Sequence, residues 1–357
     1  MEVTAKTFLE ILKAALLGKP AAPEREIPPE EWQQLFRMAQ IHQILPLFYE
    51  AVHALPGLPQ EMLITMKQQV RHQVIRQTMQ TQEFLQLNHQ LRGAGVRSLV
   101  VKGIICRNLY PKPDHRPSGD EDILIPEEQF DSCHSILTAQ GLSAGENMAE
   151  AYEIPYRKAG SPLYIELHKH LFPPESEAYG DLNRFFEGAF ARSITEQIQG
   201  AQVDTLCPTD HLFYLICHAF KHFLHSGFGI RQVCDIMLFA NRYGNQTNWS
   251  EILENCRAIR AEKFAAALFR IGRNHLCFDP EMACYPDCWQ NIPVDEIPCC
   301  RICWAPVFMA MPAGAGSTAA ISHWMPLPPR TGAERQKMPC RPPCSPPRER
   351  WRAGIPG

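Results

Sequence analysis

Two aspartates separated by one residue, Asp120 and Asp122, are the side chains of this sequence best suited to chemistry. They belong to the segment Asp120–Ile125, in which charged and apolar residues alternate as they do in a half-buried strand. In a strand, residues i and i+2 point to the same side, about 6.5 to 7 Å apart. The segment therefore predicts two carboxylates on one face of a sheet, with Glu121 on the other.

Two carboxylates this close repel each other. At ~6 Å and an effective dielectric constant near 20, the repulsion is about 3 kcal/mol. A divalent cation between them offsets this cost, and oxygen ligands favour magnesium, or manganese, which also takes oxygens from phosphates. The pair therefore indicates a metal site that activates a nucleophile and stabilises a pyrophosphate leaving group. The alternative is that Asp120 and Asp122 lie on a solvated strand edge or cap a helix.

A third carboxylate is expected on a later strand. Glu166 interrupts the apolar segment Leu163–His168, where a charge is costly unless it is paired or bound to a metal. Glu166 is therefore the candidate third metal ligand, or the base that deprotonates an acceptor hydroxyl. Otherwise it is a surface residue of the strand. His168 lies on the same face, because side chains alternate along a strand.

Residues before the aspartates are suited to binding phosphates. Gly103 fits a turn in which the backbone approaches a phosphate closely. Lys102 offers a point charge, and Arg116 offers a forked donor to a triphosphate. Solvated side chains or structural ion pairs are the alternative interpretation of Lys102 and Arg116.

A small mixed α/β unit is expected to position these residues. Its order of strand, helix, strand, helix, strand, strand follows from changes in the apolar pattern. The expected strands are 98–101, 120–125, 152–157 and 163–168, and the expected helices are 104–110 and 126–140, with a loop at 111–119.

Helical patterns flank this unit on both sides. We expect an N-terminal helical region over 1–92, an α/β core over 93–206 and a C-terminal helical region over 207–280. The glutamine-rich helix 66–90 is interpreted as a solvated helix packed on one side, with an interaction surface as the lesser alternative.

The remaining residues, 281–357, are rich in Pro, Cys and Arg, which predicts a tail that is disordered from about residue 300. The abrupt change in composition suggests translation from an altered reading frame.

Composition limits where the protein acts. The 357 residues carry a formal net charge of −3, which gives no general basis for binding a membrane and makes long nucleic acid an unfavoured partner. No segment reaches the roughly 18 uncharged apolar residues of a membrane span. Glu2 and Glu10 interrupt the N-terminal segment, which is unlike a signal peptide. We therefore expect a cytoplasmic protein whose 14 cysteines are mostly reduced and buried.

A row of basic residues is expected on one helix of the C-terminal region. His218, Lys221, His222 and His225 recur at three- and four-residue spacing and so lie near one face, where Asp235 is a candidate partner. This face is interpreted as a lining of the active-site cleft, with a half-solvated helix face or a zinc site as alternatives.

The cysteines near the C-terminus are a further candidate zinc site. Their spacing matches that of zinc ligands only in part. These cysteines are Cys284, Cys288, Cys299, Cys300, Cys303, Cys340 and Cys344.

The segment VVKGIICRNLYPKPDHRPSGDEDILI resembles the family of uncharacterised nucleotidyltransferases, within the polymerase-beta-type nucleotidyltransferase superfamily. The later segments IELHKHLF and HLFYLICHAFKHF are similar to the strand of the third acid and the helices that follow it. The resemblance covers roughly residues 8 to 280. The matching positions are Lys102, Gly103, Leu109, Tyr110, Pro111, Arg116, Pro117, Gly119, Asp120 and Asp122.

The resemblance implies an α+β fold, with a small mixed-sheet nucleotidyltransferase core flanked by N- and C-terminal helical regions. The implied activity is magnesium-dependent transfer of a nucleotidyl group from an NTP such as ATP to an acceptor hydroxyl. Asp120, Asp122 and Glu166 would then be catalytic, while Lys102, Gly103, Arg116 and Gly119 would bind the nucleotide. The acceptor remains open among a small molecule, a peptide, a protein and an RNA end.

One position departs from the superfamily pattern. Members usually have Ser after the glycine of the turn, whereas Ile104 follows Gly103 here. The missing hydroxyl supports an alternative in which the protein binds a nucleotide but has little or no catalytic turnover. A nucleotidyltransferase of a toxin system is a further alternative.

Overall fold

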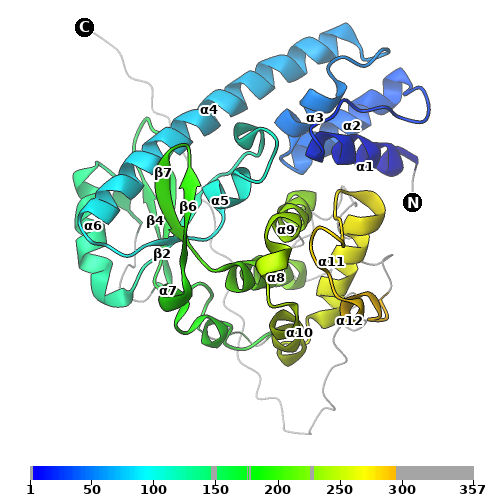
Figure 1. Cartoon of the computed structure of the whole chain (residues 1–357). Coiled ribbons are helices and arrows are strands. Elements are labelled where there is room, and N and C mark those ends of the chain that lie inside the picture. The colour runs from blue at the N-terminus through cyan, green and yellow to red at the C-terminus, as the bar shows by residue number, and fades with distance from the viewer. Residues whose placement is uncertain (1–2, 146–150, 175, 177, 226–228, 295–357) are drawn as a thin grey trace, which may run out of the picture. The chain divides into compact units, whose positions relative to one another are not determined.

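The aspartates lie on a five-stranded mixed sheet in the computed structural model, which describes residues 3–145, 151–174, 176, 178–225 and 229–294 (Figure 1). The central strand, β5 (Tyr164–His168), runs parallel to its neighbour β2 (Glu121–Leu124), and the other neighbouring pairs are antiparallel. Together with the flanking helices, this sheet confirms the predicted α+β class. The strand order is β1 (Leu99–Val100), β2 (Glu121–Leu124), β5 (Tyr164–His168), β4 (Glu153–Arg157) and β3 (Ser143–Ala144).

A long helix covers the sheet and links it to the N-terminal helices. The C-terminal half of α4 (Gln60–Gly93) contributes Phe84, Leu87 and Leu91 to an apolar cluster with the sheet and with α6 (Phe130–Ala139). In Figure 1, α4 extends from the sheet to the helices α1–α3. Burying an apolar stripe on each partner stabilises this contact.

The helical regions on either side follow the predicted pattern. The N-terminal region contains α1 (Val3–Leu16), α2 (Pro29–Ile41) and α3 (Leu45–Val52). The C-terminal region contains α8 (Pro208–His225), α9 (Ile230–Tyr243), α10 (Trp249–Ala258) and α11 (Glu262–His275). These elements, the sheet and every other described residue belong to one compact unit.

Several predicted boundaries need correction. The strand expected from Asp120 begins at Glu121, and the helix expected over 104–110 is the shorter α5 (Gly103–Arg107). The helix expected from residue 126 begins with a 3-10 turn, Glu127–Gln129, before α6. Each difference lies at the end of an element, where local sequence specifies structure least.

The sequence interpretation missed several folded segments, including the short edge strand β3. A hairpin of β6 (Ile194–Ile198) and β7 (Ala201–Thr205) turns at Gln199 and Gly200, whose φ angles are 50° and 83°. The predicted tail from residue 281 begins too early, because α12 (Asp287–Gln290) packs on the C-terminal helices. Trp289 is 1% exposed and contacts Trp249 at a ring-centroid distance of 6.0 Å. The predicted disorder beyond residue 300 lies outside the described residues.

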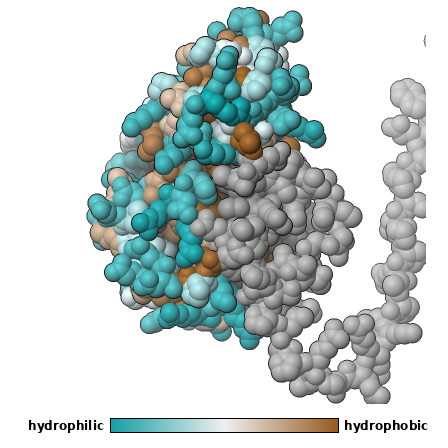
Figure 2. All heavy atoms as spheres, turned by 90° about the vertical axis from the view of Figure 1, so that its right-hand side faces the viewer, coloured by the Kyte–Doolittle hydropathy of each residue, from teal (hydrophilic) through white to brown (hydrophobic). Residues whose placement is uncertain are grey.

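No helix within the described residues is both long enough and apolar enough to span a bilayer. Where the described residues are visible in Figure 2, the surface is mostly hydrophilic, with apolar residues scattered over it.

Candidate active site

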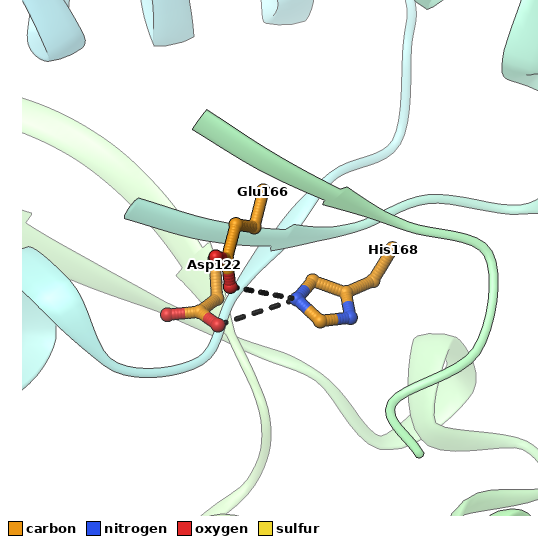
Figure 3. A group of neighbouring side chains, drawn as sticks. All are labelled: Asp122, Glu166 and His168. Atoms are coloured by element: carbon orange, nitrogen blue, oxygen red, sulfur yellow. Dashed lines mark hydrogen bonds and ion pairs between the residues drawn. The ribbon is translucent and has the colours of Figure 1, made fainter. Parts of the chain in front are cut away.

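The parallel pairing of β2 and β5 brings the predicted catalytic acids together. Asp122 pairs in register with Glu166, and two residues farther along, Leu124 pairs with His168. Because side chains alternate along a strand, Glu166 and His168 share the face on which Asp122 lies. Figure 3 shows both carboxylates facing the imidazole ring.

These three side chains form a compact group of potential metal ligands. One ligand atom from each of Asp122, Glu166 and His168 lies within 4.8 Å of the others. His168 Nε2 is 3.2 Å from Asp122 Oδ1 and 4.0 Å from Glu166 Oε2. Asp122 Oδ2 is buried and has no hydrogen-bond partner among the described residues. An unpartnered carboxylate oxygen in a buried site is costly, so the group fits a bound cation.

Asp120 lies beside this group rather than within it. It precedes β2, is half-buried and lines the same cavity as Asp122. Its charge still acts on the site, because burial, Asp122 and then Asp120 raise the pKa of Glu166 to about 7. Of the three predicted metal ligands, Asp122 and Glu166 therefore lie in the group, and His168 takes the third place. The metal role of Asp120 stays a prediction.

Lys102 is the cation closest to the acids. Its Nζ lies 3.0 Å from Asp122 Oδ1 and 3.1 Å from His218 Nε2. Burial alone would raise the pKa of Asp122, but Lys102 and His168 outweigh it and hold that pKa below its ordinary value. Burial, and then the charge of Lys102, lower the pKa of His218 well below its ordinary range. His218 is therefore neutral and accepts a hydrogen bond from the Lys102 ammonium.

Glu121 sets the backbone turn from which Lys102 extends. It is 0% exposed, so β2 is buried on both faces rather than half-buried as expected, and its Oε2 accepts a hydrogen bond of 2.8 Å from Ile104 N. Arg107 Nη2 donates to its Oε1 at 2.5 Å. Gly103 has a φ of 37°, and a Cβ at that position would collide with the Glu121 carboxylate. The glycine is thus required by packing, and its predicted contact with a phosphate stays a prediction.

Arg116 is anchored by a buried carboxylate. Its Nε and Nη2 donate to Asp235 at 2.9 and 2.6 Å, and Tyr110 donates to the same carboxylate at 2.8 Å. The suggested pairing of Asp235 with the histidine face of α8 is therefore wrong, because Asp235 points to the loop before β2. Arg116 Nη1 is buried without a partner in the described part of the chain. The predicted contact of Arg116 with a phosphate stays a prediction, and Nη1 is the nitrogen that would make this contact.

A cavity of about 370 Å³ connects these groups. Both acidic and cationic side chains line this cavity. The acidic ones are Asp120, Asp122, Glu153 and Glu166. Gly119 lines an adjacent cavity instead. The cationic and imidazole side chains of the lining are Lys102, Arg116, Lys221, Arg231, His168, His218 and His222.

The described residues give little support to the zinc sites suggested at the histidines of α8 and at the cysteines near the C-terminus. The rings of His218 and His222 meet edge to face with centroids 4.6 Å apart, yet they belong to no group of three potential ligands among the described residues. Cys284 and Cys288 are exposed and free, while Cys299, Cys300, Cys303, Cys340 and Cys344 lie outside the described residues. The nine described cysteines form no disulfide, and most of them are buried, as predicted.

Sequence reasoning missed three residues of this site. Glu121 was assigned only an orientation, and its buried pairing with Arg107 was not predicted. Arg231 and Glu153 line the cavity from α9 and β4. Their contribution depends on how distant elements pack, which leaves no local signal in the sequence.

Comparison with solved structures finds distant similarity to nucleotidyltransferases. An antigenic nucleotidyltransferase-like protein from Paracoccidioides brasiliensis shares 12% identity with a TM-score of 0.34, covering 57% of this chain and 96% of that protein. The antibiotic-resistance factor ANT(2'')-Ia shares 16% identity with a TM-score of 0.36, covering 55% of this chain and 100% of that one. No curated protein matches the sequence. The family model described as uncharacterised nucleotidyltransferase matches residues 28–276, which include the whole site, and the chain therefore belongs to this nucleotidyltransferase family.

Proposed function

We propose that the protein transfers a nucleotidyl group from an NTP to an acceptor hydroxyl with the help of magnesium or manganese. The observation that carries this proposal is the buried, unpartnered Oδ2 of Asp122, with Glu166 paired beside it on the next parallel strand. Two carboxylates with an open oxygen suit a hard divalent cation.

Asp122 and Glu166 would hold the cation, with Asp120 at the edge of the site. When bound, the cation supplies positive charge to the phosphates and to the pyrophosphate leaving group. His168 lies 3.2 Å from Asp122 Oδ1, so it orients that carboxylate and also offers a nitrogen ligand of the kind transition metals accept.

The alternative role of Glu166 is that of the base for the acceptor hydroxyl, with Asp122 and Asp120 then holding the cation. Burial and the neighbouring acids raise its pKa to about 7, and a base works best when its pKa lies near the working pH. The acceptor oxygen would transfer its proton to Glu166 and attack the α-phosphorus, and pyrophosphate would leave.

The cationic side of the cavity would bind the triphosphate. Lys102 lies at the edge of the acidic group, and Arg116 offers its unpartnered Nη1. Because Asp235 holds the other two nitrogens of Arg116, the guanidinium is fixed before a phosphate arrives, which lowers the entropy cost of binding.

The test is transfer of label from each of the four α-labelled NTPs to molecules of a cell extract. Magnesium-dependent transfer that is lost in Asp122→Asn but kept in Glu254→Gln, an exposed change on α10, supports the proposal. Binding of an NTP without transfer, under all metal conditions, would support the alternative of a binding module.

One contact favours that alternative. Ile104 N, in the turn after Lys102, donates to Glu121 and is therefore not available to a phosphate in this arrangement. A Glu121→Gln variant separates the two functions. If the turn must release Ile104 N for catalysis, weakening this contact raises transfer, whereas a module without turnover gains none.

A further inference from the structure

A second cavity, of about 310 Å³, lies beside the active-site cavity. It lies between the α2–α3 turn, the middle of α4 and the loop 117–119. Ser118 lines both cavities, and Gly119, which lines the second one, directly precedes Asp120. A molecule in the second cavity would therefore lie against the loop that carries Asp120. The volume is within the range of small-molecule sites.

Glutamine amides dominate this cavity, which we call the glutamine pocket. The oxygens of three of them are already engaged within the protein. Gln77 Oε1 accepts from Ser118 N at 2.7 Å, and Gln69 Oε1 accepts from Gln40 Nε2 at 2.9 Å. Gln43 Oε1 accepts from Arg231 at 2.8 Å. What these side chains still offer a ligand is their NH₂ groups.

Gln77 gives the clearest sign of a missing ligand. The residue is 3% exposed, and its Nε2 is buried without a hydrogen-bond partner anywhere in the described ranges. Leaving a buried amide donor unsatisfied costs roughly 1–3 kcal/mol, so such groups are rare unless something else binds them. An acceptor oxygen of a bound molecule would satisfy it.

Gln43 gives a second sign. Its φ of 54° is a left-handed conformation that is uncommon for residues other than glycine. Glycine would adopt this turn without strain, but it would lose the amide that joins Arg231 and the pocket. Strain of this kind is concentrated at binding and catalytic sites.

The charged side chains that line the glutamine pocket indicate which class of ligand it binds. Arg76 lines the glutamine pocket, and no aspartate or glutamate of the described chain does. Several neutral donors with one guanidinium suit a group that is rich in acceptor oxygens and carries about one negative charge. A cationic ligand would find no counter-charge there.

We infer that the glutamine pocket binds the acceptor, and that the acceptor is a small hydroxylated molecule bearing a carboxylate or phosphate. This inference rests on the proposed nucleotidyl transfer. The acceptor's oxyanion would contact Arg76 and the amides, and its hydroxyl would have to pass Ser118, which lines both cavities, to reach the cavity that Glu166 lines. A nucleic-acid end fits less well, because one arginine offers little to a chain of phosphates.

The test measures where label goes and what Arg76 contributes. The full-length protein is incubated with magnesium and α-labelled NTPs together with one of three pools from the same extract: the ultrafiltered small-molecule fraction, total RNA or total protein. Label is expected in the small-molecule pool, in a product retained on an anion exchanger. Glycerate and glycerol 3-phosphate, added singly as competitors with glycerol as the neutral control, show whether a carboxylate or a phosphate is preferred.

Arg76→Gln should raise the apparent KM for the small-molecule pool about ten- to a hundredfold, because a hydrogen bond to a charged group is lost. The KM for the NTP should stay unchanged, and Arg76→Lys should recover part of the loss. Arg71→Gln, an exposed change on the same helix outside the glutamine pocket, is the matched control and should behave as the wild type.

Two results overturn the inference while leaving nucleotidyl transfer intact: label appearing in RNA or protein, or Arg76→Gln transferring with the wild-type KM. Absence of transfer to every pool by the wild type would overturn the proposed function, and the inference with it.

Discussion

The raised pKa of Glu166 makes stability depend on pH in a direction opposite to that of most carboxylates. Burial and the charges of Asp122 and Asp120 raise this pKa from 4.5 to about 7. The folded protein therefore holds a proton that the unfolded chain releases between pH 4.5 and 7. The resulting stabilisation is fully present below pH 4.5 and is lost as pH rises through 7.

The size of the effect follows from the difference between the two pKa values. Moving the pKa of a carboxyl from 4.5 to about 7 corresponds to about 3 kcal/mol. The Glu166 side chain is 23% exposed, which leaves most of this value unscreened by solvent. Glu166→Gln keeps the shape and removes the charge. At pH 8 it should be more stable than the wild type by up to about 3 kcal/mol, and near pH 4 the two should be equal.

Urea unfolding from pH 4 to 8, with EDTA present, measures this difference. EDTA is needed because a bound cation would neutralise the acids and mask the effect. Glu254→Gln, on the exposed face of α10, removes a carboxylate of ordinary surroundings and is the control. A stability difference between Glu166→Gln and the wild type that does not change with pH would refute this reasoning.

Three further predictions concern the neighbouring residues. Lys102→Met should destabilise the protein by about 3–5 kcal/mol in urea unfolding, because it leaves Asp122 buried without its cation. Gly103→Ala should cost at least about 2 kcal/mol in the same assay, because its Cβ meets Glu121 and its φ is 37°. Magnesium at a hundred times its Kd should stabilise the wild type by about 2.7 kcal/mol in thermal unfolding and leave Asp122→Asn unchanged.

Local sequence was sufficient for the elements that carry the acids. The alternation around Asp122 and the apolar run around Glu166 predicted two strands, and the structure confirms both. What the sequence could not give is which strands are neighbours. The parallel register that sets Asp122 beside Glu166 depends on the crossover between them, and this depends on how α6 packs on the sheet.

The parts that sequence missed depend on contacts between distant segments. The partner of Asp235 was misjudged, because periodicity places residues on a helix face but does not say what packs against it. His168 enters the potential ligand group only through the β2–β5 pairing. The β6–β7 hairpin is the exception, because Gly200 at its turn is a local signal that the interpretation did not use.

The flanking helices hold the loop that precedes Asp120, through one hydrogen bond from each helical region. Gln77 of α4 accepts from Ser118 N at 2.7 Å, and Arg231 of α9 donates to Pro117 O at 2.7 Å. One contact comes from the N-terminal helical region and the other from the C-terminal region, so the α/β core alone contains neither. The family model spans residues 28–276, from just before α2 to the end of α11, as expected if these helices fix the geometry of the acids. Under the proposed function, a ligand that shifts either helix would therefore move Asp120 and alter transfer without touching the acids.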